Sequence, residues 1–282
     1  MRLPALLKTL LLGITLIATP ALAEDAVPLD ANGRVPVGFK GDDAEKIYNA
    51  LAKLPELKKD QFESQADYAA RIDKIKDTIA LPGGKTLGSR MAFVIDREGV
   101  RPDEYDSDSH LIRATVASKY GSIDVGSDLT SEKWSNTLQG FIFSSKSKLI
   151  GTYSASNSFG AKVTVRKDDV NEVWVGFDAQ KFREKAKLGS SLLPLGNDGA
   201  KFSLDAEKAR DAVGNLKLIV VAHAFPPFHV YGEKHISPTI QYPHEETKRI
   251  RAVYVSVDEV WIYNAKNGEV YKKIIASDEA KK

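Results

Sequence analysis

Apolar residues early in the chain recur with the spacing of a helix. Between residues 64 and 80 they are separated by four, three and four positions and share one helical face: Tyr68, Ile72, Ile75 and Ile79. Ser64 with Asp67 three positions later is typical of a capped helix start. Asp67 also precedes Arg71 by four residues, the favourable order for an ion pair. The pattern predicts an amphipathic helix that begins at Ser64 and is ended by Pro82-Gly83-Gly84.

A shorter helical pattern precedes this one. It starts after Asp43, ends at Pro55, and places four apolar residues on one face: Ile47, Tyr48, Leu51 and Leu54. Together the two segments predict a helical hairpin or two successive docked helices.

From Arg90 onward the alternation changes to a period of two, which is typical of strands. The predicted strands are 91–95, 110–119, 138–143, 148–156, 159–166 and 172–177. The polar residues 96–109 are expected to form a loop. Residues 144–147 and 167–171 are expected to be short connections, and short connections join antiparallel neighbours.

The last third of the chain mixes helix, strand and loop signals. A short helix at 182–188 and a loop through 199 precede a helix at 204–213, for which Ser203 is the expected cap. A strand at 216–225 is expected to end at Pro226-Pro227, followed by a loop to about residue 248. The remaining predicted strands are 250–257, 259–263 and 270–275, with Asn267-Gly268 as a hairpin turn.

These elements predict an α+β fold in which N-terminal helices pack on a mostly antiparallel β-sheet. We expect an extended lead at 24–42, one domain at 43–276 and a tail at 277–282. A break into two subdomains near 180–200 is the alternative.

The first residues have the pattern of a secretory signal peptide. Arg2 and Lys8 give a positive start, an apolar run covers residues 10–18, and Ala21-Leu22-Ala23 is a small-x-small cleavage site. The run is too short to span a bilayer. We therefore expect removal of residues 1–23, a bacterial periplasmic or secreted protein, and no stable membrane insertion after cleavage.

Charge and cysteine usage exclude several classes of protein. The chain has 40 Lys and Arg against 38 Asp and Glu, and the predicted signal peptide holds two of the basic residues, so the remainder is neutral. Such a balance argues against nucleic acid or an anionic membrane as the main partner. Cysteine is absent, which excludes disulfides, thiolate metal sites and a lipid-anchored N-terminal cysteine.

One short segment resembles a sequence found in other proteins. Phe62, Glu63, Ser64, Tyr68 and Arg71 form the pattern F-E-S-x-x-x-Y-x-x-R. It resembles a segment of exported bacterial proteins of unknown function, which commonly reads F-E-T-x-x-x-[FY]-x-x-R near the mature N-terminus. The resemblance covers about ten residues and implies export, but no activity and no catalytic residue.

Residues 223–246 hold three glutamates, Glu233, Glu245 and Glu246, and four of the five histidines: His223, His229, His235 and His244. Imidazole and carboxylate groups are ligands for zinc or copper, so His229, His235 and His244 are a candidate metal site. Their spacings match no known ligand pattern, and the alternative is that these histidines pack or form hydrogen bonds.

Three weaker candidates are also present. Ser145 and Lys148 form the S-x-x-K of penicillin-binding enzymes, without the companion motifs. A hydroxyl-rich hairpin at 153–158, with Tyr153 or Trp174 as a stacking platform, would suit a sugar or peptidoglycan. Acidic residues at 103–108 would suit calcium, without the EF-hand glycine.

No nucleotide-binding, serine-hydrolase or zincin motif is present, and no cofactor is implied. The sequence favours a non-enzymatic exported module that binds a protein or an envelope ligand. The alternatives are a metal-dependent enzyme or hydrolase that uses the 223–246 region, and a carbohydrate or peptidoglycan binder.

Overall fold

The computed structural model describes residues 26–96, 99–122, 137–156, 158–187 and 200–276. The predicted signal peptide, the C-terminal tail and most of the proposed break near 180–200 lie outside these residues. The α+β class is confirmed. The helices are α1 (Ala44–Leu51), a 3₁₀ turn (Pro55–Leu57), α2 (Gln65–Ile75), α3 (Ala179–Lys185) and α4 (Ala206–Val213).

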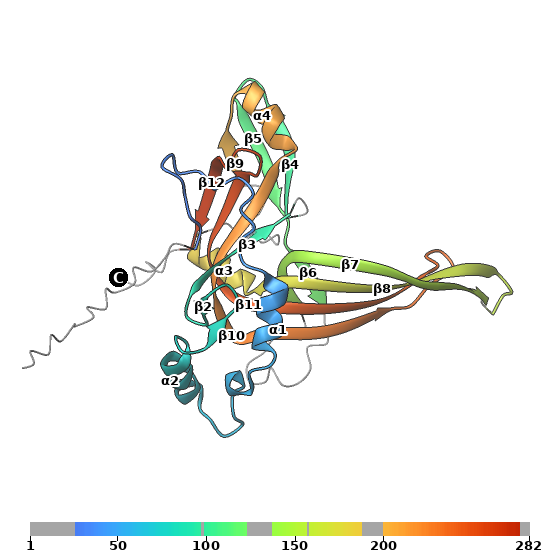
Figure 1. Cartoon of the computed structure of the whole chain (residues 1–282). Helices are drawn as coiled ribbons and strands as arrows, with labels where there is room; N and C mark the ends of the chain where they lie inside the picture. The colour runs from blue at the N-terminus through green and yellow to red at the C-terminus, as the bar shows by residue number, and fades with distance from the viewer. Residues whose placement is uncertain (1–25, 97–98, 123–136, 157, 188–199, 277–282) are drawn as a thin grey trace, which may run out of the picture.

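The strands form three sheets (Figure 1). The main sheet has the order β3-β10-β11-β8-β7-β6, and β12 also pairs with β11. Its strands are β3 (Arg90–Ile95), β6 (Lys119–Ser122), β7 (Thr137–Ser156), β8 (Lys162–Phe177), β10 (Leu216–Ile236), β11 (His244–Asn264) and β12 (Val270–Ile275). The two small sheets are β1 (Ala80–Leu81) with β2 (Lys85–Thr86), and β4 (Val100–Asp106) with β5 (Leu111–Val116) and β9 (Lys201–Ser203).

Pairing in the main sheet is antiparallel except between β8 and β11, which run parallel. The outer strands cover only one end of the long ones. β6 pairs with residues 137–140 of β7, and β3 pairs with residues 218–223 of β10. The far halves of β7 and β10 therefore have one strand neighbour each within the described part of the chain.

Four strands are much longer than the sequence predicts. The expected connections at 144–147 and 167–171 are wrong, since these residues lie inside β7 and β8. The expected loop from 226 to about 248 is also wrong: only residues 237–243 separate β10 from β11. Both faces of these segments carry polar side chains such as serine, lysine and aspartate. The alternation of apolar and polar residues that identifies a strand in a sequence is therefore missing here.

Strand β10 passes through Pro226-Pro227 instead of ending there. Its pairing with β11 shifts register between Ala224 and His229, and Phe228 has a φ of 68°. Proline is tolerated at such an irregularity because the ladder hydrogen bonds are already interrupted. The shift divides β10 into a half beside β3 and a half that continues outward.

Helix α2 begins as predicted and ends earlier. Ser64 Oγ accepts a hydrogen bond from the Asp67 amide at 3.1 Å. The helix stops at Ile75, so the buried Ile79 lies beyond it, and Pro82-Gly83-Gly84 instead turns β1 into β2. The expected Asp67–Arg71 ion pair is wrong.

Arg71 binds the preceding segment instead. Its Nε and Nη2 atoms donate to the two carboxylate oxygens of Glu63 at 2.8 and 2.9 Å, and Nη2 also donates to the Lys58 carbonyl. The Tyr68 hydroxyl donates to the buried Leu57 carbonyl at 2.8 Å. Glu63, Tyr68 and Arg71 therefore fix the approach to α2, which gives the F-E-S-x-x-x-Y-x-x-R segment a structural role.

Two further expectations need correction. The predicted polar loop at 96–109 contains β4, whose exposed edge positions carry acidic side chains. The helix at 204–213 is α4, and its cap is Asp205 rather than Ser203, because the Asp205 carboxylate accepts from the Lys208 amide at 2.8 Å. Asn267-Gly268 lies in the turn between β11 and β12, as predicted.

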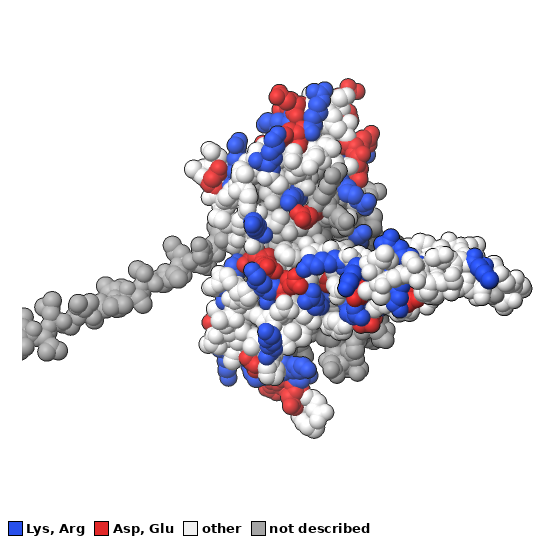
Figure 2. Space-filling view, turned by 45° about the vertical axis from the view of Figure 1, so that its right-hand side comes forward, with Lys and Arg blue, Asp and Glu red and all other residues white. Residues whose placement is uncertain are grey.

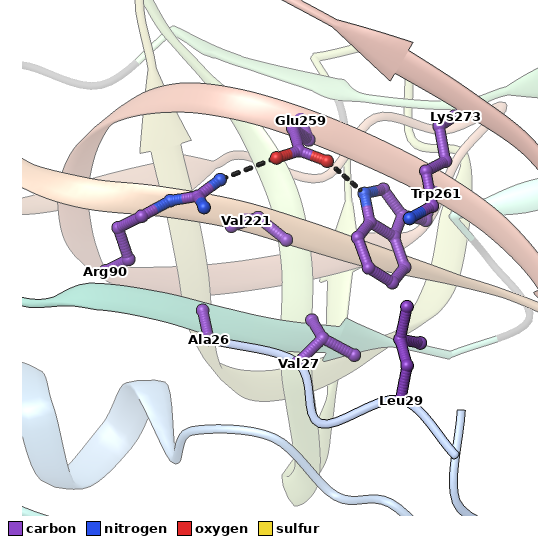
Figure 3. Close-up of a pocket in the computed structure, with 8 residues that line it drawn as sticks. All are labelled: Ala26, Val27, Leu29, Arg90, Val221, Glu259, Trp261 and Lys273. Carbon is purple, nitrogen blue, oxygen red and sulfur yellow. Dashed lines mark hydrogen bonds and ion pairs between the residues drawn. The ribbon is translucent and has the colours of Figure 1, made fainter. Parts of the chain in front are cut away.

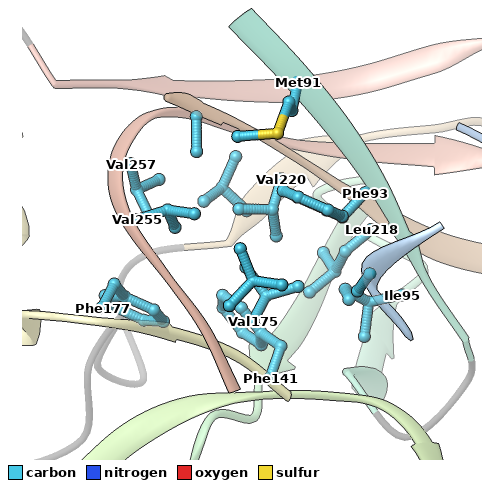
Figure 4. Close-up of a cluster of buried hydrophobic side chains, with 14 of the residues drawn as sticks. Met91, Phe93, Ile95, Phe141, Val175, Phe177, Leu218, Val220, Val255 and Val257 are labelled. Carbon is cyan, nitrogen blue, oxygen red and sulfur yellow. The ribbon is translucent and has the colours of Figure 1, made fainter. Parts of the chain in front are cut away.

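The core lies where β3, β10, β11, β8 and β7 overlap (Figure 4). The Phe141 and Phe177 rings stack at 5.2 Å. Helix α1 adds Ile47 and Leu51 to the same cluster. A second cluster holds the N-terminal lead on the sheet: Val27 and Val35 are buried against Trp261 and neighbouring residues. No helix of the described part of the chain is long and apolar enough to cross a membrane.

Candidate functional site

The main sheet continues beyond the core as a projecting arm (Figure 1). We define the arm as residues 144–156 of β7, 162–172 of β8, 229–236 of β10 and 244–251 of β11. Thirteen residues of β7 correspond to roughly 40 Å at strand spacing. Because β8 and β11 run parallel, the β7–β8 turn and the β10–β11 turn lie at the same end. We call that end, residues 149–167 and 236–244, the arm tip.

One face of the arm is continuous with the surface that α1 covers, and we call it the α1 face. There Arg251 donates to Glu45 of α1 at 2.8 Å. Further out, Glu245 accepts from the Tyr153 hydroxyl and from Lys167 Nζ, each at 2.7 Å. These two hydrogen bonds lower the pKa of the Glu245 carboxyl. On β11, Arg249 lies between Glu245 and Arg251, and it forms ion pairs with two more carboxylates, Asp169 and Glu233.

The opposite face carries a second row of carboxylates. Asp168 Oδ2 accepts from Arg166 Nε at 2.7 Å and lies 2.8 Å from His244 Nε2. Burial alone would raise the pKa of Asp168, but the hydrogen bonds from Arg166 and His244 outweigh it and lower that pKa. Asp168 Oδ1 has no hydrogen-bond partner among the described residues.

Nearer the core on the same face, Glu172 is buried. Its Oε2 accepts from the Trp174 indole at 2.8 Å, and its Oε1 lies 3.3 Å from Lys248 Nζ. The carboxylates of both faces thus accept hydrogen bonds or form ion pairs, although Asp168 Oδ1 has no such partner. The lowered pKa of Asp168 and of Glu245 makes these two groups weaker bases than usual.

The cations of these pairs lie outside the carboxylates. The Asp168 side chain is 5% exposed and its partner Arg166 is 61% exposed. Lys167 and Lys248 are likewise more exposed than Glu245 and Glu172. On the face shown in Figure 2, the outer part of the arm carries Lys and Arg atoms among uncharged ones. The charge that the arm presents to a partner is therefore mainly positive.

The arm tip combines this positive charge with exposed apolar side chains. Six large hydrophobic residues of the tip are exposed: Leu149, Ile150, Tyr153, Phe159, Ile240 and Tyr242. Phe159, in the β7–β8 turn, is 94% exposed. An exposed apolar group of this size on a projecting element typically marks a contact surface. The sequence analysis missed it, although the S-F-G turn between two polar strands was a visible signal.

A small pocket lies at the other end of the sheet, beneath the N-terminal lead (Figure 3). Glu259 accepts from Arg90 Nη2 at 2.6 Å and from the Trp261 indole at 2.7 Å. Lys273 Nζ lies 3.5 Å from the centre of the Trp261 ring. The volume is about 160 Å³, below the roughly 300 Å³ at which small-molecule sites begin. Its charged groups mostly pair with each other, so its main role is to join β3, β11 and β12.

Comparison of the chain with protein-family models, with curated proteins and with solved structures gives no match. The resemblance of residues 62–71 to exported proteins stays a prediction. The choice of a function therefore depends on the geometry of the arm and on the candidate residues named from the sequence.

The three candidate metal ligands do not converge. His229 and His235 lie on the α1 face of β10, six residues or roughly 20 Å apart. His244 lies on the opposite face, beside Asp168. His229 packs edge-on against the Tyr48 ring at 5.8 Å, and His235 Nδ1 lies 3.4 Å from the Thr247 hydroxyl. The described residues contain no group of three His, Asp or Glu side chains that could hold a metal ion.

The weaker candidates are also explained by local structure. Ser145 and Lys148 lie mid-strand in β7, so the helix start that S-x-x-K chemistry needs is missing. Trp174 is buried and cannot stack on a sugar, and the Tyr153 hydroxyl is used by Glu245. In the acidic segment, Asp106 accepts from the Ser109 hydroxyl and Asp103 from Thr115, so these carboxylates bind their own strands and turn.

His229 makes the stability of the arm base dependent on pH. Burial lowers the pKa of His229 below its ordinary value of 6.5, and the charge of Lys58 acts in the same direction. Between the two pKa values the unfolded chain therefore binds a proton at His229 that the folded protein does not bind. The contribution of His229 to stability is fully present above the pKa of the unfolded state and is lost as the pH falls through the pKa of the folded state. We expect the melting temperature of His229→Gln to fall less than that of the wild type from about pH 7.5 to about pH 5.

The matched control is His235→Gln, which replaces an exposed histidine of the same strand. Thermal melts across the pH range, followed by circular dichroism, compare the three proteins. If His229→Gln keeps the full wild-type pH dependence, the burial of His229 is not its cause.

Proposed function

We propose that this protein is an exported binding module of the bacterial envelope and that the arm is its binding surface. In this proposal residues 1–23 direct export and are removed after Ala23. The N-terminal helices then pack on a mostly antiparallel sheet, and this body is the fixed base from which the arm projects. The observation that carries the proposal is the arm tip, where Phe159 and five other large apolar side chains face solvent.

A projecting sheet whose carboxylates are engaged by neighbouring donors is better suited to binding than to chemistry. Asp168, Asp169, Glu172 and Glu245 each form an ion pair with a Lys or Arg of the arm. A rigid, four-stranded platform also presents side chains at low entropic cost, because the strands hold them in place before a partner arrives. These properties support an interaction role over the metal-dependent and sugar-binding alternatives.

Photo-crosslinking in living cells tests this function. A photoreactive phenylalanine analogue is placed at Phe159 or Tyr242 in the arm tip, and at Phe62 or Val213 elsewhere on the surface. All four side chains are exposed in the free protein. We expect adducts, with protein or lipid, from the two tip positions and none from the two control positions.

Adducts that form equally from Phe62 and Val213 would mean that the tip has no special role. Failure of both tip positions to crosslink would also contradict the proposal. N-terminal sequencing of the recovered protein checks export in the same experiment, since processing after Ala23 leaves Glu24 first.

A further inference from the structure

The charges of the arm are segregated along its length. From residue 146 to 167 there are five basic residues and no Asp or Glu: Lys146, Lys148, Lys162, Arg166 and Lys167. From 234 to 244 there is Lys234 and again no acidic residue. By register Lys148 lies opposite Asp169 and Leu149 opposite Asp168, so these carboxylates are level with that part of β7. The hairpin beyond them carries Lys162, Arg166 and Lys167 and no Asp or Glu. The tip is therefore basic although the chain as a whole is close to neutral.

Half of these basic residues lack a carboxylate partner. Lys148, Lys162 and Lys234 are exposed and form no ion pair with any residue that the structure describes. By register Lys148 lies opposite Asp169 and Lys234 opposite Lys248, so both lie nearer the core than the end turn. Phe159 lies in the turn that leads to Lys162. Apolar side chains flanked by lysines match the two layers of a membrane surface, acyl chains below and anionic headgroups above.

The choice of lysine argues for lipid over protein. Protein interfaces are depleted in lysine and enriched in arginine, whose planar group makes directional pairs. Five of the six basic residues in these two segments are lysines, which act as point charges with long flexible stems. Such charges suit a diffuse layer of anionic headgroups. The tip is also a projecting end, which fits a flat surface.

We propose that the arm tip binds the surface of a bilayer that contains anionic phospholipid. Phe159 enters the interface, and Lys162 contacts phosphate groups. The contact is peripheral and reversible. It rests on the proposed function, because it names the partner of the same arm. The chain as a whole is close to neutral because carboxylates outside the tip balance its basic residues.

Vesicle co-sedimentation tests the proposal with the exported, processed protein. The vesicles contain equal amounts of phosphatidylglycerol and phosphatidylethanolamine, or phosphatidylcholine alone. We expect binding to the first kind, weakening with added salt, and little binding to the second. Phe159→Ser should weaken binding about tenfold, because burying one phenylalanine contributes about that factor.

Matched controls separate vesicle binding by the tip from nonspecific binding by other exposed residues. Phe62→Ser removes a phenylalanine that is 88% exposed and lies off the arm, and it should bind like the wild type. Lys162→Glu should weaken binding strongly, whereas Lys74→Glu makes the same charge change on the helical region and should not. Thermal melts confirm that each variant is folded.

Two results would overturn the membrane proposal. One is absence of binding to either vesicle, and the other is an equal loss in Phe159→Ser and Phe62→Ser. If vesicles are not bound while the photoreactive group at Phe159 still crosslinks to a protein in cells, the arm remains the binding surface and its partner is a protein. If neither occurs, the proposed function fails as well.

Discussion

Val220→Asp is expected to leave the protein largely unfolded. Val220 is 0% exposed and lies in the half of β10 that pairs with β3, opposite Phe93 of β3 and Val260 of β11 (Figure 4). A carboxylate there has no partner and no water. Burying an unpaired charge costs at least several kcal/mol, comparable to the whole stability of a domain, roughly 5–15 kcal/mol. Loss of the far-ultraviolet strand signal and of a cooperative melt at room temperature is the expected readout.

Val37→Asp is the matched control, because it makes the same chemical change at a side chain that is 74% exposed in a turn of the lead. Its effect should stay within about 0.5 kcal/mol. A cooperative melt of Val220→Asp close to that of Val37→Asp would show that β10 is not at the centre of the core.

The second large effect is expected at Gly268, in the turn between β11 and β12. Its φ is 75°, a region that disfavours side chains, and a Cβ there would overlap the carbonyl oxygen of Val35. The backbone conformation costs about 1–2 kcal/mol for alanine, and the overlap adds about 1–3 kcal/mol. Gly268→Ala should therefore lower the melting temperature by roughly 5–15 °C. It should also speed hydrogen exchange at the Val35 amide, which donates to the Gly268 carbonyl at 2.9 Å.

Gly33→Ala separates the two contributions. Gly33 has a similar φ of 72°, but no atom lies within 4 Å of the position that a Cβ would take. Only the conformational cost applies, so the loss should be about half as large or less. Equal melting temperatures for the two variants would mean that the lead is not fixed on this turn.

The sequence predicts the helical part of the fold well and the arm poorly. Ser64 and the apolar face of α2 are strong local signals, because a cap and a buried stripe are properties of one segment. Arg71 was assigned the wrong partner, since sequence spacing favours Asp67 whereas the folded chain brings Glu63 into bidentate contact. The partner of Arg71 is therefore set by how the chain folds back before α2, which spacing within the helix does not show.

The arm escaped prediction for a related reason. Lys146 and Asp169 lie in strand interiors, yet polar residues in such runs are usual for turns. Their strands are held by each other and by distant partners, above all by the parallel pairing of β8 with β11, which no local pattern encodes. The candidate site was missed with the arm. The clustering of histidines in the sequence also suggests a metal site that the fold does not bring together, because His235 on β10 and His244 on β11 face opposite sides of the sheet.

The uncovered edges of the arm affect how copies of the protein meet. Beyond residue 140 the outer side of β7 has no strand neighbour in the described chain, and an open edge is a template for further pairing. Two antiparallel copies of β7 would bring Lys146 and Lys148 of one copy toward those of the other, which is unfavourable. Register shifts after Ile142 and after Leu149 also distort the edge. The lysines and the register shifts thus disfavour edge-to-edge pairing of the arms of two copies.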